Sequence, residues 1–400
     1  MSRTIVDRTG LDGPLPPARP SARRPRRRRS PARKALIVFA VFALLAAVIG
    51  VAWAYYRYRQ FDFVEVPGLE LPASSSAPTN WLLVGTDSRE GVDPNADDFL
   101  GDADAIPGQR ADTIMVARVD SATQSIDLLS VPRDLWVPIV GEGEGRINGA
   151  FDGPGGRERL VLTVQNYLGV PVNHYAEINF SGFQAMVEAL GGVPVWFDAP
   201  IRDPNSGLNI VDAGCHLLNG PQALSFARAR HAEVYQNGEW VAETTGDLGR
   251  TARQREFLSN VAATASTKVN VGGLLTLDRL LGAAADTMVV ADGAGVSDVT
   301  DLARTFAAAE GGQFVTHTLP VSDWVTSGGA QVLLLDEVAA QPTLDLFRES
   351  GEVLADNETL SGDQTIPESK VGTVVGLSAE ELASTAISGV TQADCPNQGS

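Results

Sequence analysis

A stretch of 22 residues without a charge, residues 35–56, constrains this chain more than any other sequence feature. At about 1.5 Å of rise per residue, a helix of this length spans roughly 33 Å, close to the hydrocarbon thickness of a bilayer. Trp53, Tyr55 and Tyr56 stand near its end, as aromatic residues do at a membrane interface. The run is too long for a cleaved signal peptide and lacks a small-x-small cleavage site, so the sequence predicts a transmembrane helix.

The charges on either side of this segment predict its orientation. Residues 1–34 hold eleven Lys and Arg against two Asp, about +9, and the whole chain carries −18, which leaves about −27 on residues 35–400. Basic flanks stay inside the cell, so we expect a cytoplasmic N-terminal tail and an extracytoplasmic acidic domain on a single-pass membrane protein. An acidic domain repels nucleic acid, so no nucleic-acid partner is expected.

The rest of the chain divides by composition into three parts. Residues 57–79 are rich in Pro and Ser and are predicted to be a linker, residues 80–349 form the folded domain, and residues 350–400 are expected to be a flexible tail. Alternating and helical patterns predict an α/β fold for the domain. Strands are expected over 80–85, 113–119, 125–131, 192–197 and 314–319, helices over 160–168, 180–190, 221–224, 247–268, 272–285 and 299–309, and an extended segment over 225–230.

Cysteine and histidine usage limits the chemistry. Cys215 and Cys395 are the two cysteines, both on the predicted outer side, where an even count permits one disulfide; two buried free thiols are the alternative. We expect a structural bond with no part in catalysis. The four histidines are scattered and make no HExxH, so a histidine-based zinc site is not expected.

The polar residues with the strongest chemical signal are arginines and aspartates at the ends of predicted elements. Guanidinium groups bind phosphate oxygens in pairs of hydrogen bonds, and carboxylates suit a hard cation such as Mg²⁺. Surface ion pairs are the alternative for any one of them, but the set as a whole predicts a metal-assisted pyrophosphate site. The candidates are Asp87, Arg89, Arg110, Asp112, Arg133, Asp134, Arg146, Asn148, Arg228, Arg230, Arg250, Arg253 and Gln254.

Two of these groups are predicted to present their side chains together. Arg228 and Arg230 stand two apart in the predicted extended segment, which puts both on one face. Arg250, Arg253 and Gln254 have i, i+3 and i+4 spacing on the predicted long helix, which also puts them on one face.

Seven sequence blocks in order resemble the LytR-CpsA-Psr family of cell-wall glycopolymer transferases. The resemblance is close over roughly residues 79–270 and extends to about residue 349. The blocks are NWLLVGTDSR, RADTIMVARVD, LLSVPRDLWV, RINGAF, INFSGFQAMVEALGGVPV, LNGPQALSFARAR and GDLGRTARQREFL. The resemblance implies a bacterial, membrane-anchored protein with a mixed central β-sheet flanked by helices. It also implies a hydrophobic pocket for a polyprenyl tail and a basic mouth for the pyrophosphate.

The resemblance also assigns roles to the candidates. It implies that Asp87 and Asp112 bind Mg²⁺, and that Arg133, Arg230, Arg250 and Gln254 act at the pyrophosphate. The supporting, substrate-binding positions are Arg89, Arg110, Arg146, Asn148, Arg228 and Arg253. Asp134 or Asp112 is the candidate to accept the proton of the acceptor hydroxyl. An acidic insertion over residues 90–109 supplies further carboxylates that could join or compete at the metal site.

The reaction implied is transfer of a glycan phosphate from a polyprenyl-pyrophosphate-linked donor to peptidoglycan, giving a phosphodiester link. Two other classes stay open: a phosphohydrolase acting on polyprenyl pyrophosphate, and a non-catalytic, membrane-anchored glycopolymer-binding protein. A pure binder has no need for the aspartate pair, which argues against the last class. The sequence names neither the glycan, the length of the lipid nor the oligomeric state.

Overall fold

The computed structural model describes residues 45, 48–74, 77–87, 111–243, 246–308, 314–326, 329–348 and 395. The predicted cytoplasmic tail, most of the predicted transmembrane segment, Arg89, Arg110, the acidic insertion and, apart from Cys395, the predicted C-terminal tail lie outside these residues. Residues 48–58 are helical. Within the described ranges, no helix has the length and hydropathy of a membrane span.

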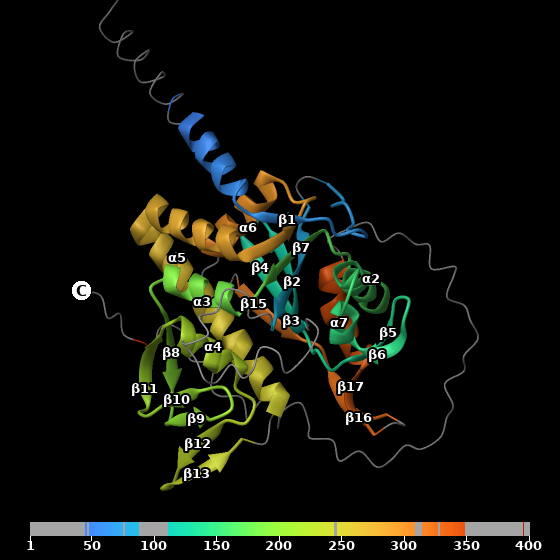
Figure 1. Cartoon of the computed structure of the whole chain (residues 1–400), viewed down its shortest axis with the longest axis vertical. Coiled ribbons are helices and arrows are strands. Elements are labelled where there is room, and N and C mark those ends of the chain that lie inside the picture. Colours follow the sequence, from blue (N-terminus) through green and yellow to red (C-terminus); the bar gives the residue numbers. More distant parts are fainter. Residues whose placement is uncertain are drawn as a thin grey trace, which may run out of the picture. The chain divides into compact units, whose positions relative to one another are not determined.

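A seven-stranded mixed sheet forms the centre of the fold (Figure 1). Strand pairs β1–β14, β7–β2 and β4–β15 are parallel, and the remaining neighbours are antiparallel. The expected α/β fold with a mixed central sheet is therefore confirmed. In spatial order the strands are β1 (Asp62–Val64), β14 (Met288–Ala291), β7 (His174–Ile178), β2 (Thr79–Thr86), β3 (Ala111–Asp120), β4 (Ser125–Val131) and β15 (Phe314–Thr318).

Alternation along the central strands feeds two cores, one on each face of the sheet. Leu82 and Val84 of β2 pack with α2 (Gly156–Leu168) and α7 (Glu337–Arg348), whereas Trp81 points to the opposite face. There it packs in a core that includes α5 (Gly246–Thr287) and α6 (Val296–Ala308). Because successive side chains of a strand point to opposite faces, each central strand supports both layers.

A smaller β-rich layer packs on helices α3, α4 and α5 around a third core. Asn179 caps α3 through the backbone N–H of Gly182, and Asn219 forms a capping box with Gln222 on α4. These local signals explain where both helices begin. The elements are α3 (Phe180–Ala189), β8 (Val193–Phe197), β9 (Ile201–Asp203), β10 (Leu208–Ile210), β11 (Gly214–Leu218), α4 (Gly220–Arg228), β12 (Glu233–Gln236) and β13 (Glu239–Ala242).

Two hairpins stand beside the sheet edge at which β2 and β4 end. The first joins β5 (Trp136–Ile139) to β6 (Gly143–Arg146) and leads into a 3-10 helix, η2 (Ile147–Phe151). The second joins β16 (Val321–Val325) to β17 (Gln331–Leu335). A parallel bridge between Leu135 and Leu333 links the two hairpins.

Two expectations about elements were wrong, and one was confirmed. Residues 57–79 are not simply a linker, because β1 pairs with β14 and Phe61 and Val66 are buried. Residues 225–228 are not extended, since they complete α4. The two helices expected over 247–268 and 272–285 are confirmed: α5 (Gly246–Thr287) consists of two helices that meet at a kink at Gly273, where the backbone is not helical and φ is +57°.

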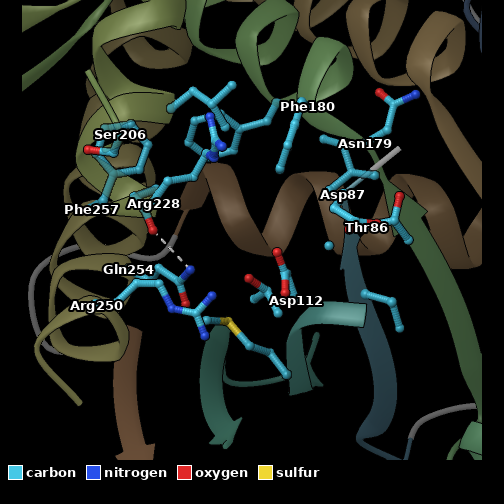
Figure 2. A pocket seen from close by; sticks show the side chains of 18 of the residues that line it. Thr86, Asp87, Asp112, Asn179, Phe180, Ser206, Arg228, Arg250, Gln254 and Phe257 are labelled. Atoms are coloured by element: carbon cyan, nitrogen blue, oxygen red, sulfur yellow. Dashed lines mark hydrogen bonds between the residues drawn. The ribbon is translucent and has the colours of Figure 1, made fainter. Parts of the chain in front are cut away.

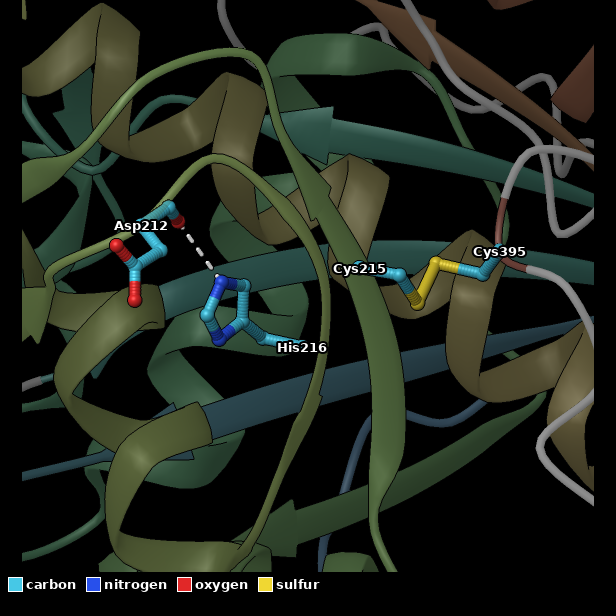
Figure 3. Close-up of a disulfide and its surroundings, with 4 residues drawn as sticks. All are labelled: Asp212, Cys215, His216 and Cys395. Atoms are coloured by element: carbon cyan, nitrogen blue, oxygen red, sulfur yellow. Dashed lines mark hydrogen bonds between the residues drawn. A yellow bond between two sulfur atoms is a disulfide. The ribbon is translucent and has the colours of Figure 1, made fainter.

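Cys215 and Cys395, which we predicted to pair, form a disulfide with a Cα–Cα distance of 5.3 Å (Figure 3). Cys215 lies on β11. The next residue, His216, approaches the carbonyl of Asp212 with its Nε2 at 2.8 Å. The bond therefore attaches Cys395 to the smaller β-rich layer.

Candidate functional site

A cavity of about 460 Å³ opens at the sheet edge where β2 ends and β3 begins (Figure 2). Asp87 directly follows β2, and Asp112 is the second residue of β3. The strands are antiparallel, with Thr86 opposite Ala111, so both aspartates reach the same edge. The structure thus brings together the two carboxylates that we predicted as a pair.

The cavity lining changes character along the strands. Near the sheet edge the lining is polar, and further along the strands it is apolar. Leu83 lies beside Met115 and Ala176 on the neighbouring strands, and Met288 lies beside Ile178, so these lining residues form a continuous apolar surface. The charged side chains are those of Asp87, Asp112, Asp203, Arg228, Arg230 and Arg250, and the uncharged polar ones include Thr86, Asn179 and Gln254. The apolar ones include Leu83, Met115, Ile178, Phe180, Phe183, Leu224, Phe257, Leu258 and Met288.

Asp112 and Asp134 organise a chain of opposite charges at this edge. Asp112 Oδ1 lies 2.6 Å from Arg133 Nη1 and 3.7 Å from Arg230 Nη2. Asp134 lies 3.6 Å from Arg133 Nε through Oδ2 and 3.3 Å from Arg146 Nε through Oδ1. Arg133, Asp134 and Arg146 do not line the cavity themselves, but this chain connects them to Asp112, which does.

Arg228 and Arg230 both line the cavity, although not as an extended pair. Arg228 is the last residue of α4, and its guanidinium carbon lies 4.9 Å from the centroid of the Phe180 ring. Arg230 follows the extended C-cap Ala229. The end of a helix, rather than the period of a strand, therefore sets the directions of these two arginines.

Asp203 holds the segment that carries Arg230, and the sequence analysis missed it. Its Oδ2 accepts the backbone N–H groups of Arg230 and His231, each at 2.8 Å. Burial raises the pKa of Asp203, but these hydrogen bonds and those from Asn205 and Ser206 outweigh burial and lower the pKa below its usual value. Locally, the sequence DPNSG signals only a turn, and nothing in it points to residue 230.

The N-terminal part of α5 supplies Arg250 and Gln254 but not Arg253. Arg250 is buried in the cavity wall, and Gln254 Nε2 donates to the carbonyl of Ala227 at 3.1 Å. Arg253, expected to bind substrate, is 1% exposed and instead bonds Glu243 at 2.6 Å and the Ala229 carbonyl at 2.7 Å. The role assigned to Arg253 was therefore wrong, because this side chain braces the end of α4.

Asn148, which was expected to bind substrate, contacts Arg133 through its backbone. Its N–H donates to the carbonyl of Arg133 at 3.2 Å, and it belongs to η2 next to the β5–β6 hairpin. It does not line the cavity. Arg89 and Arg110 belong to the part of the chain that the structure does not describe.

The chemistry near Asp87 and Asp112 suits a hydrated divalent cation. Thr86, also in the cavity lining, directly precedes Asp87, and its Oγ1 is buried without a hydrogen-bond partner. Among the described residues, no group of three or more His, Cys, Asp or Glu could enclose a metal. Mg²⁺ requires no such cage, because it is usually held by one or two carboxylates, waters and substrate phosphates.

Comparison with known proteins places this geometry in context. Residues 56–346 match the model of the LytR_cpsA_psr family. The probable cell wall biosynthesis protein LcpB of Corynebacterium glutamicum is 35% identical over 311 residues, which are 78% of this chain and 70% of that protein.

Two further likenesses are more limited. The polyisoprenyl-teichoic acid–peptidoglycan teichoic acid transferase TagU of Halalkalibacterium halodurans is 34% identical over 189 residues, 47% of this chain and 53% of that protein. The chain thus spans about half the length of this relative. A solved LytR-Csp2A-Psr enzyme from Actinomyces oris superposes with a TM-score of 0.56 at 24% identity, over 73% of this chain and 96% of that one. At this identity the likeness concerns the fold.

Proposed function

Because this chain belongs to the LytR_cpsA_psr family, we propose that it transfers a glycopolymer phosphate from a polyprenyl-pyrophosphate-linked donor to peptidoglycan. The product is a phosphodiester link in the cell wall. Relatives named for cell wall biosynthesis and for teichoic acid transfer to peptidoglycan support this class of donor and acceptor. 

The observation that carries the proposal is the two-part lining of the cavity. Arginines and carboxylates gather at the sheet edge, and apolar side chains continue along the same strands. A lipid-linked pyrophosphate has this same division, a polyanion joined to a hydrocarbon chain. The apolar part would bury prenyl units, while Arg228, Arg230 and Arg250 would contact phosphate oxygens.

The proposed step forms one bond and breaks one. An acceptor hydroxyl oxygen bonds to the phosphorus that carries the glycan, and the bond from this phosphorus to the bridging oxygen of the pyrophosphate breaks. Polyprenyl phosphate leaves with the electron pair, and the hydroxyl proton passes to a carboxylate, for which Asp112 and Asp134 are the candidates. The arginines stabilise the negative charge that develops on the leaving phosphate.

Asp87 and Asp112 are the residues that we propose to hold Mg²⁺. The adjacent placement of the two carboxylates and the unpartnered Thr86 hydroxyl support this assignment. The bound ion would supply positive charge beside the pyrophosphate oxygens. Arg133 contacts Asp112 from outside the cavity and keeps this carboxylate at the sheet edge.

We also propose that residues 35–56 anchor the protein in a bacterial cell membrane with its catalytic domain outside. The uncharged segment and the basic residues before it support this arrangement. Protease added to intact cells should then remove the domain and spare the N-terminal tail. A domain that is protected until the cells are broken would contradict this orientation.

The function is tested with a donor labelled in its glycan, incubated with the full-length protein with and without peptidoglycan. We expect label on peptidoglycan, together with stoichiometric release of polyprenyl phosphate. Equal release without acceptor, with label remaining soluble, would identify a hydrolase. Donor that binds without turnover in the presence of Mg²⁺ and acceptor would identify a binding protein.

A further inference from the structure

Two tryptophans from distant parts of the chain meet at the surface next to the candidate site. Trp136 begins β5 and Trp324 lies on β16, with ring centroids 6.3 Å apart in an edge-to-face arrangement. Trp324 is 41% exposed, and Trp136 is half-buried. The Nε1–H of Trp136 already donates to Glu144 at 3.2 Å, so what the pair offers to a ligand is mainly its aromatic surface.

The two hairpins that carry these rings are fixed to one another by backbone hydrogen bonds. The N–H of Leu333 donates to the carbonyl of Asp134 at 3.0 Å, next to the Leu135–Leu333 bridge. The guanidinium of Arg146 donates to the carbonyl of Gln331 at 2.9 Å. The aromatic pair therefore has a defined position relative to Asp134 and Arg146.

A continuous chain of charges leads from this pair to the cavity. Arg146 contacts Asp134 at 3.3 Å, Asp134 contacts Arg133 at 3.6 Å, and Arg133 contacts Asp112 at 2.6 Å. Asp112 lines the cavity in which the pyrophosphate is proposed to bind. A polymer whose end reacts at Asp112 would pass these side chains and reach the tryptophans.

We propose that Trp136 and Trp324 form a glycan-binding subsite for the acceptor, on which a sugar ring of the peptidoglycan strand stacks; this inference rests on the proposed function. The apolar C–H face of a pyranose ring packs on an aromatic ring, while its hydroxyl groups need polar partners around it. The exposed side chains of Arg146 and Glu144 border the pair and meet that need. A charged border of this kind favours a carbohydrate over an apolar peptide segment.

The test measures the acceptor and the donor separately in the full-length protein. With saturating donor, Trp324→Ala should raise KM for soluble, uncrosslinked peptidoglycan strands about tenfold. KM for the donor should stay within twofold of wild type. Trp324→Tyr, which keeps an aromatic face, should restore most of the acceptor affinity.

Trp196→Ala is the control for loss of a tryptophan elsewhere in the domain. Like Trp136, Trp196 is half-buried and donates its Nε1–H to a carboxylate, that of Asp198 at 2.9 Å, but it lies on β8 in the smaller layer. This variant should behave as wild type. An unchanged acceptor KM in Trp324→Ala, or an equal loss in both tryptophan variants, would overturn the subsite.

Binding without turnover separates this inference from the proposed function. The same peptidoglycan strands are titrated into each protein in a calorimeter, in the absence of donor. Their Kd should be about tenfold higher for Trp324→Ala than for wild type or Trp196→Ala. If this difference is found in a protein that transfers nothing, the subsite stands and the transferase proposal fails. If transfer occurs but all three proteins bind the strands equally, the subsite fails and the transferase stands.

Discussion

At the scale of single residues, Asp112 connects the proposed Mg²⁺ site to two arginines. It accepts Arg133 at 2.6 Å, lies 3.7 Å from Arg230, and lines the cavity near Asp87. Its removal would therefore disturb two arginines as well as the proposed Mg²⁺ site.

Alanine at either Asp87 or Asp112 should lower Mg²⁺-dependent transfer by about a hundredfold or more, because the cation loses one of its two carboxylates. The measurement is initial rate against Mg²⁺ concentration, with circular dichroism to verify folding. Asp112→Ala should also raise KM for the donor, since Arg133 and Arg230 lose their common partner. Undiminished activity of both variants in the presence of a chelator would reject the metal assignment.

Arg230→Lys should lower kcat by about tenfold or more even though the charge is kept, because lysine cannot make the paired hydrogen bonds of a guanidinium to phosphate. Arg202→Lys is the control, since Arg202 stands on neighbouring β9 and is paired with Glu233 at 2.7 Å outside the cavity. Steady-state kinetics with the labelled donor provides the comparison. Equal rates for both variants would mean that only the net charge at residue 230 matters.

Glu256 makes stability depend on pH. Burial and, to a smaller extent, the negative charge of Asp198 raise its pKa from 4.5 to about 7, although the positive charge of Arg253 lowers it. Between about pH 4.5 and pH 7, Glu256 of the folded protein keeps a proton that the unfolded chain has released. The stabilisation from this group is therefore complete below about pH 4.5 and is lost as the pH rises to about 7.

Glu256→Gln, which is neutral at every pH, should thus gain stability over wild type as the pH rises. We expect the free energies of unfolding to match at pH 4.5 and the variant to exceed wild type by about 3 kcal/mol at pH 8. Urea unfolding at both pH values measures this, with Glu239→Gln at an exposed site as the control. A difference between Glu256→Gln and wild type that is the same at pH 4.5 and pH 8 would contradict the assignment.

At the scale of elements, α5 positions the C-terminal end of α4. Arg253 and Gln254 donate to the carbonyls of Ala229 and Ala227, so two successive residues of α5 hold the end of α4, where Arg228 is the last residue and Arg230 follows the C-cap. The carbonyl groups at the end of a helix otherwise lack intrahelical partners. The same contacts complete α4 and aim its arginines into the cavity.

Arg253→Met should lower the free energy of unfolding by about 3 kcal/mol, because it leaves Glu243 and the Ala229 carbonyl without their buried partner. It should also raise KM for the donor, although Arg253 does not line the cavity. Arg304→Met removes an exposed ion pair to Asp301 on α6 and should cost less than about 1 kcal/mol. Equal unfolding curves for the two variants would show that Arg253 is not a brace.

At the scale of the whole molecule, the Cys215–Cys395 bond joins residues 180 apart in sequence. In the chain-entropy model, closing a loop of that length stabilises the fold by up to roughly 5 kcal/mol. Cys215 lies opposite Trp196 of β8 in the smaller β-rich layer. Asp87 and Asp112, by contrast, lie at the edge of the central sheet. We therefore expect a bond that affects stability and not catalysis.

Peptide mapping of the unreduced protein should recover the two cysteine peptides joined. Replacing both cysteines by serine should lower the thermal midpoint, because the unfolded chain gains freedom, while kcat at 25 °C stays within twofold of wild type. Quantitative alkylation of both thiols in unreduced, unfolded protein would exclude the bond. A large fall in kcat of the folded double variant would contradict its separation from catalysis.

Much of the fold could be predicted from local sequence, because local patterns determine it. The strand predicted over 125–131 coincides with β4, and the α3 and α4 caps, Asn179 and Asn219, are local signals. Asp87 and Asp112 could be paired in advance, since each stands at the end of a recognisable strand. The seven sequence blocks predicted family membership, which the match over residues 56–346 confirms.

Only the tertiary structure decided what depends on contacts between distant residues. Asp203 accepts the N–H of Arg230 from 27 residues away, and Arg253 donates to Ala229 from 24 residues away. Trp136 and Trp324 meet only because two separate hairpins share the Leu135–Leu333 bridge. Helical spacing predicted that Arg250 and Arg253 share one face. It could not show that the guanidinium of Arg253 would bond Glu243 and the Ala229 carbonyl instead of lining the cavity. Periodicity predicts which way a side chain leaves its own element, whereas its partner is fixed by how the elements pack.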